Sequence, residues 1–93
     1  MYKETYKKAI DFFGHNGQIL KTIEELSELQ RALSRWSIEK ETKVFVKADN
    51  VFEEIADVDL MLEQLKLIFD CHDIINTVKQ QKIERLEGLL DGK

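Results

Sequence analysis

The chain has 93 residues, with 14 lysines and arginines against 18 aspartates and glutamates, and a formal net charge of −4. This length predicts one domain, residues 1–93, and the acidic balance argues against nucleic acid as a partner, because its binders usually carry a basic patch. No apolar run approaches the roughly 20 residues that cross a membrane. The N-terminus is polar, and the single cysteine, Cys71, cannot form an intramolecular disulfide. Both features favour a cytoplasmic protein.

Helical periodicity predicts two helices in the first half of the chain, separated by the cluster Gly14–Gly17. Apolar residues before this cluster recur at intervals of three and four residues. After it, a 3.6-residue period continues as far as Trp36, and Asn16 is the expected N-cap of this second helix. The period weakens over residues 37–48, which we expect to be a linker with at most a turn of helix.

The second half of the chain predicts two further helices, over residues 51–69 and 74–90. Asn50 and Glu53 resemble a capping box for the third helix, and Asp73 is placed to cap the fourth. Proline is absent and alternating strand patterns are missing. The predicted fold is therefore an all-α bundle of about four helices. Because so short a chain buries only about 60–65% of its unfolded surface, we expect dimerisation or tetramerisation to complete the bundle.

Four acidic residues stand in two pairs at helical spacing. Glu25 and Glu28 share one face of the second helix, and Glu54 and Asp57 share one face of the third. Either pair alone is typical of a solvated face. Consecutive residues of an α-helix are rotated by about 100° around its axis. On this basis Glu54 falls inside the apolar arc of the third helix, which is the sector of its circumference that carries the apolar side chains. Glu25 lies at the border of the apolar arc of the second helix. Such buried carboxylates cost several kcal/mol unless they are paired or bind a metal. Antiparallel packing would bring all four together, where a hard divalent cation would relieve their repulsion.

These pairs carry a resemblance to a known family. Glu24-Glu25-x-x-Glu28, then 25 residues, then Glu54-x-x-Asp57 resembles the signature of the MazG-like all-α nucleoside triphosphate pyrophosphohydrolases. The segments "TIEELSELQRAL" and "NVFEEIADVDLMLEQL" are similar to the metal-binding helices of short, single-domain, phage-type members. The resemblance covers residues 18–67 well and the last helix loosely.

The resemblance implies hydrolysis of nucleoside or deoxynucleoside triphosphates to the monophosphate and pyrophosphate by a homodimer or homotetramer. The cofactor would be Mg²⁺, or alternatively Mn²⁺, and the ligands carried over by position are Glu25, Glu28, Glu54 and Asp57. Phosphoryl transfer also needs a group that accepts a proton from the attacking water. Glu25 or Glu28 is the expected catalytic base.

Six further residues are predicted to contact the nucleotide. Three cations spaced by three residues in the fourth helix could hold the phosphates, with a further lysine in the second. A glutamine and a tryptophan on the border of the carboxylate stripe could hydrogen-bond and stack on the base. These residues are Gln18, Lys21, Trp36, Lys79, Lys82 and Arg85. The alternative is that the lysine stems only cover apolar surface, and that Trp36 belongs to the core or to an interface.

Two other functions remain open from the sequence. One is a pyrimidine-specific enzyme of the dimeric dUTPase or dCTPase type, which shares the acidic helices. The other is a helical oligomeric interaction module without catalysis, whose acidic stripe is only a surface. Glu54 discriminates against the module, because an interaction helix has no reason to hold a bare carboxylate on its packing face.

Overall fold

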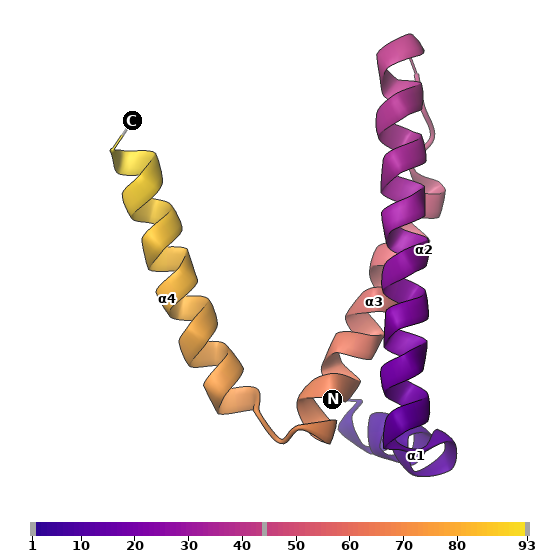
Figure 1. The fold of residues 1–93 in the computed structure, drawn as a ribbon, viewed down its shortest axis with the longest axis vertical. Coiled ribbons are helices and arrows are strands. Elements are labelled where there is room, and N and C mark those ends of the chain that lie inside the picture. Colours follow the sequence, from indigo (N-terminus) through magenta and orange to yellow (C-terminus); the bar gives the residue numbers. More distant parts are fainter. Residues whose placement is uncertain (1, 44, 93) are drawn as a thin grey trace.

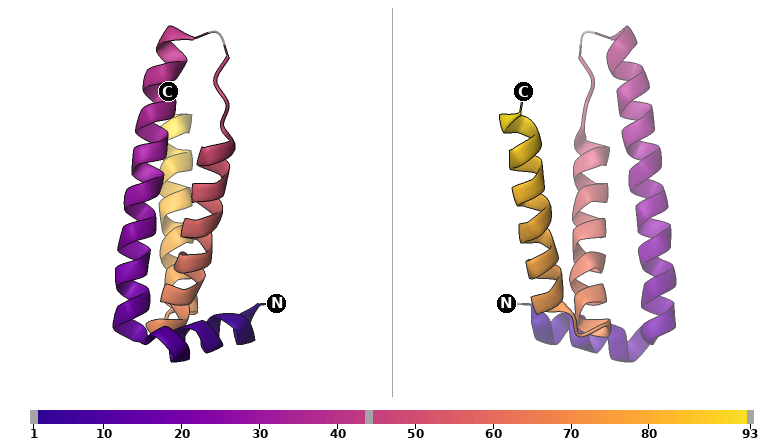
Figure 2. Two further views of the ribbon diagram at one scale, coloured as in Figure 1. Left: turned by 90° about the vertical axis from the view of Figure 1, so that its right-hand side faces the viewer. Right: turned by 60° about the vertical axis from the view of Figure 1, so that its left-hand side comes forward.

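All regular structure in the computed structural model is helical, over the described residues 2–43 and 45–92. The four helices in chain order are α1 (Lys3–Phe13), α2 (His15–Thr42), α3 (Asp49–Ile68) and α4 (His72–Asp91). Helices α2 and α3 form an antiparallel hairpin, α1 lies across one end of it, and α4 contacts α3 alone and diverges from the hairpin (Figure 1, Figure 2). The predicted all-α class and its four helices are confirmed.

A single residue, Gly14, joins α1 to α2. Its N–H donates to the Ile10 carbonyl at 2.8 Å, and its carbonyl accepts from the Gln18 N–H at 3.0 Å, so Gly14 closes one helix and opens the next. Its φ of 81° is a conformation that glycine adopts without steric cost. Because α2 begins directly after Gly14, Asn16 lies inside the first turn, and its predicted role as N-cap is wrong.

The other predicted helix boundaries are also shifted. Helix α3 begins after Ala48 and α4 after Cys71, neither with a side-chain cap, so the predicted caps Asn50 and Asp73 lie within first turns. Helix α2 continues to Thr42, well into the segment expected to be a linker. Glutamate and lysine are good helix formers, and an ion pair of 3.9 Å between Glu39 and Lys43 spans the last turn.

The interior of one chain is thin. Among residues 2–43 and 45–92, the buried apolar residues are Ile10, Val58 and Met61. Gln18 and Gln64 are also buried and share a hydrogen bond of 2.6 Å from Gln18 Nε2 to Gln64 Oε1. Many large apolar side chains stay exposed, and α4 has no buried residue. Within the described ranges, none of these helices is both long enough and apolar enough to span a membrane.

Helix α3 ends in a Schellman motif whose left-handed residue is Asp70, with a φ of 48°. The Asp70 N–H donates to the Leu67 carbonyl at 3.2 Å and the Cys71 N–H to the Lys66 carbonyl at 3.1 Å, as this motif requires. The conformation costs a residue with a side chain roughly 1–2 kcal/mol, and less for aspartate.

We therefore expect Asp70→Gly to stabilise the protein by about 0.5–1 kcal/mol, measured as a higher urea midpoint with an unchanged slope. Asp73→Gly is the matched control and should destabilise, because it removes an acidic group from the first turn of α4 and places glycine inside a helix. A lower midpoint for Asp70→Gly would contradict the assignment of this turn.

Candidate metal centre

Three carboxylates converge where α2 and α3 face each other. Oxygen atoms of Glu25 on α2 and of Glu54 and Asp57 on α3 lie within 4.8 Å of one another. The antiparallel hairpin creates this arrangement, because each pair lies on the face that its helix turns toward the other. Glu25 is only 7% exposed, Glu54 is half-buried and Asp57 is exposed. The cluster is therefore buried at one side and open at the other.

The carboxylates are incompletely neutralised. Lys21 places its Nζ 3.0 Å from Oε1 of Glu25 and 3.3 Å from Oε1 of Glu24, and the hydrogen bond to Glu25 is the main cause that raises the pKa of Lys21. Oε2 of Glu25 and Oε2 of Glu54 are buried, and no donor in the described part of the chain reaches either atom. Unsatisfied buried oxygens of this kind are rare in folded proteins.

Electrostatic repulsion is concentrated on Glu54. Burial is the main cause that raises the pKa of its carboxyl group, and the charges of Glu28, Asp57 and Glu25 raise it further. Glu28, half-buried, lies outside the converging trio but lines the same groove as Glu54. All four predicted ligands thus belong to one charged neighbourhood.

The donor set fits a hard divalent cation. Opposite ligands of Mg²⁺ lie about 4.2 Å apart and those of Ca²⁺ about 5 Å apart, from their usual ligand distances. The oxygen separations in the trio, all within 4.8 Å, are compatible with these distances. Oε2 of Glu25 and Oε2 of Glu54, which have no donor among the described residues, would be available to such an ion.

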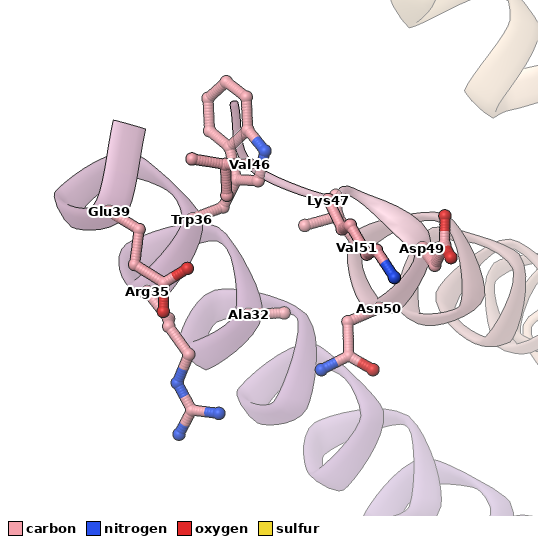
Figure 3. A pocket seen from close by; sticks show the side chains of 9 residues that line it. All are labelled: Ala32, Arg35, Trp36, Glu39, Val46, Lys47, Asp49, Asn50 and Val51. Carbon is pink, nitrogen blue, oxygen red and sulfur yellow. The ribbon is translucent and has the colours of Figure 1, made fainter. Parts of the chain in front are cut away.

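The other predicted site residues are spread along the molecule. Gln18 is buried with its amide bonded to Gln64, and its role toward a nucleobase stays a prediction. Trp36 lies near the far end of α2, where its ring lines a pocket with Val46 (Figure 3). Its Nε1 is buried, with no acceptor among the described residues. Lys79 lines an apolar pocket between α3 and α4.

The fourth helix does not bring its cations to the trio within one chain. Lys82 and Arg85 lie further along α4 than Lys79, in the part that diverges from the hairpin (Figure 1). The predicted phosphate contacts of these three residues stay predictions, and they would need α4 of another copy.

The sequence interpretation missed two arginines that lie closer to the carboxylates than the cations of α4 do. Arg31 and Arg35 line a groove of about 310 Å³ together with Glu28, Glu54, Ala32 and Asn50. The signal was available in the spacing, because residues three and seven positions after Glu28 lie on its side of an α-helix. Both arginines were overlooked because they stand outside the apolar arc.

Comparison with known proteins finds no match to a family model, to a curated protein or to a solved structure. The resemblance to MazG-like enzymes therefore rests on the acidic motif and its flanking segments.

Proposed function

We propose that this protein is a Mg²⁺-dependent nucleoside triphosphate pyrophosphohydrolase. The observation that carries the proposal is the pair of buried, unpaired oxygens on Glu25 and Glu54, within a trio of carboxylates from two helices. A solvated acidic face would not bury such oxygens without partners, because doing so costs free energy that only a cation or a donor returns.

Glu25, Glu54 and Asp57 would hold the ion, with Glu28 beside them. When bound, Mg²⁺ supplies charge neutralisation on phosphate oxygens and a lower pKa for a coordinated water. Glu28 is the better placed of the two predicted bases, because it lines the open groove while Glu25 is buried and pairs with Lys21. Its carboxylate would accept the proton of the water that attacks a phosphorus atom, as the bond to the leaving pyrophosphate breaks.

Self-association is part of the proposal. Helix α4 buries no residue in the chain, yet its apolar side chains gather on one half of the helix surface. The exposed members are Ile74, Val78, Ile83, Leu86, Leu89 and Leu90. Apolar area of this extent marks a contact surface. A homodimer or homotetramer that covers α4 would also bring the cations of this helix toward the site of another copy.

The cytoplasm is the proposed location. Cys71 is the one cysteine of the sequence and is free, which fits a reducing compartment.

Pyrophosphate release is the direct test. A panel of canonical and modified nucleoside and deoxynucleoside triphosphates would be incubated with the protein, with Mg²⁺ in one series and EDTA in the other. We expect release that depends on the metal and leaves the monophosphate, and the ranking across the panel would separate a general enzyme from a pyrimidine-specific one.

Metal binding itself has a separate readout in thermal stability. An ion that binds only the folded form stabilises it by about 2.7 kcal/mol at one hundred times its Kd. For a domain of this size this corresponds to a Tm increase on the order of 10 °C. No increase at millimolar Mg²⁺ and no pyrophosphate from any nucleotide would favour the non-catalytic interaction module instead.

A further inference from the structure

Two grooves meet on the side of the hairpin that carries the carboxylates. The first, of about 310 Å³, is lined by Glu28, Arg31 and Glu54 among others, and the second, of about 320 Å³, extends toward Trp36 and Val46. Three residues line both: Ala32, Arg35 and Asn50. The small side chain of Ala32 points toward Asn50, while Arg35 and Trp36 extend from α2 in different directions (Figure 3). The grooves therefore form one continuous path that begins beside the carboxylates.

The arginines on this path form no ion pair with any residue that the structure describes. The ion pairs of the described chain involve Lys21, Lys43 and Lys66, and neither Arg31 nor Arg35 takes part in one, although Glu28 lies one turn before Arg31. Both guanidinium groups belong to exposed residues. They are thus free to bind an external anion, and a guanidinium group matches the geometry of phosphate oxygens through two parallel hydrogen bonds.

The local charge explains why such cations are needed. The four carboxylates carry four negative charges when ionised, and Lys21 with a single divalent ion would offset three of them. The centre would keep at least one negative charge, because Glu24 shares Lys21 and Glu53 adds its own charge beside Glu54, and it would repel a polyphosphate. Arg31 and Arg35 supply two positive charges against this repulsion. In addition, Glu25 carries an unpaired oxygen on a side chain that is more than nine-tenths buried, which indicates a cation beside Glu54, one of the residues that line the groove.

We infer that Arg31 and Arg35 form the phosphate-binding side of the metal centre, so that a metal-bound triphosphate lies along α2 with its phosphates against these arginines. The inference rests on the proposed function and deepens it. It places the phosphate contacts within the same chain as the carboxylates, on α2 and not on α4. The part of the ligand beyond the phosphates points toward Trp36.

Inorganic tripolyphosphate is the probe that tests this inference, because it carries the phosphates without a base and its binding requires no hydrolysis. Calorimetric titration into the Mg²⁺-loaded protein would compare the wild type with Arg31→Ala, Arg35→Ala and the double variant. We expect each single change to weaken binding about tenfold, as charge-assisted hydrogen bonds are lost. Arg35→Lys should recover only part of the loss, because lysine keeps the charge without the fork.

Lys8→Ala on α1 is the matched control and should leave the affinity unchanged, since it removes an exposed positive charge elsewhere. The Mg²⁺-dependent rise in Tm should persist in the arginine variants, which separates loss of phosphate binding from loss of the metal or of the fold. Trp36 is the only tryptophan, so its fluorescence gives a second readout of groove occupancy by a nucleoside triphosphate.

Two results would overturn the inference. One is an unchanged tripolyphosphate affinity in the double arginine variant. The other is a loss of affinity in Lys82→Ala or Arg85→Ala that equals or exceeds that of the arginine variants, which would place the phosphates on α4. Neither result depends on turnover. If the protein hydrolyses nucleotides but the arginine variants bind tripolyphosphate as well as the wild type does, this inference alone is overturned. If binding depends on the arginines but no nucleotide is hydrolysed, the proposed reaction alone is overturned.

Discussion

Glu54→Gln should abolish Mg²⁺-dependent pyrophosphate release while making the metal-free protein more stable. Loss of groups that only support metal ligands typically lowers activity or metal affinity 10–100-fold, so loss of a ligand should lower turnover by more than about a hundredfold. In EDTA the same change removes a charge that burial disfavours most and that four neighbouring carboxylates, with Glu53 the weakest, disfavour further. Turnover in Mg²⁺ and Tm in EDTA should therefore move in opposite directions.

Glu53→Gln is the matched control, because it removes the same charge from the preceding, exposed position. It should leave turnover near the wild-type value. Undiminished turnover in Glu54→Gln would refute the assignment of Glu54 to the metal centre. A Tm of this variant in EDTA below that of the wild type would refute the electrostatic repulsion between Glu54 and the neighbouring carboxylates.

The stability gain of Glu54→Gln should also depend on pH. The pKa of Glu54 is raised in the folded protein, so the folded form binds more protons than the unfolded chain between the two pKa values. The free energy of unfolding of the metal-free wild type therefore falls as the pH rises from the ordinary range of a glutamate, about 4.3, through the raised value. The advantage of the variant should be small below this window and reach a plateau above it.

Leu86→Asp should dissociate the assembly that we propose. Leu86 is 55% exposed in the single chain and lies within the apolar half of α4. If a second copy covers it, the substitution loses the burial of a leucine, about 1.5–3 kcal/mol, and places a charge in an apolar contact. The dissociation constant should rise more than about a hundredfold. Light scattering after size-exclusion chromatography would show a shift toward the 10.9 kDa monomer.

Gln80→Asp provides the control for that change, because it introduces the same charge on the opposite, polar side of α4. It should leave the measured mass unchanged. A wild-type protein that is already monomeric at high concentration, or a Leu86→Asp variant with unaltered mass, would show that α4 does not form the contact.

The fold could be predicted from the sequence as far as the spacing of apolar residues indicates which face of a helix is buried. The spacing of apolar residues identified all four helices, because each one turns an apolar face to something. Helix ends were less accessible. Gly14 serves two helices at once, so no side-chain cap was needed at Asn16. Residues 37–42 are helical without an apolar period, because this end of α2 extends beyond α3 (Figure 1).

The carboxylates could be predicted because their position is unusual for their chemistry. Glu54 lies in an apolar arc, and the structure accordingly gives it a buried oxygen without a donor. The cations were harder to assign for the opposite reason. An exposed arginine is unremarkable on a helical wheel, so Arg31 and Arg35 became visible only when α3 placed Glu54 and Asn50 opposite them. The sequence of one helix does not indicate which other helix packs against it. For the same reason, the neighbours of Lys79 on α4 could not be predicted.

The hydrogen bond between Gln18 and Gln64 has a consequence for the alignment of the hairpin. Apolar contacts between two helices tolerate sliding, because one leucine can replace another along the seam. A buried amide pair does not, since a slip of one turn, about 5.4 Å, would separate the Gln18 Nε2 donor from the Gln64 Oε1 acceptor inside the protein. The same slip would carry Glu54 and Asp57 out of register with Glu25. Gln18 lies about two turns from Glu25, and Gln64 about two turns from Asp57, so their hydrogen bond fixes the relative position of the carboxylate oxygens.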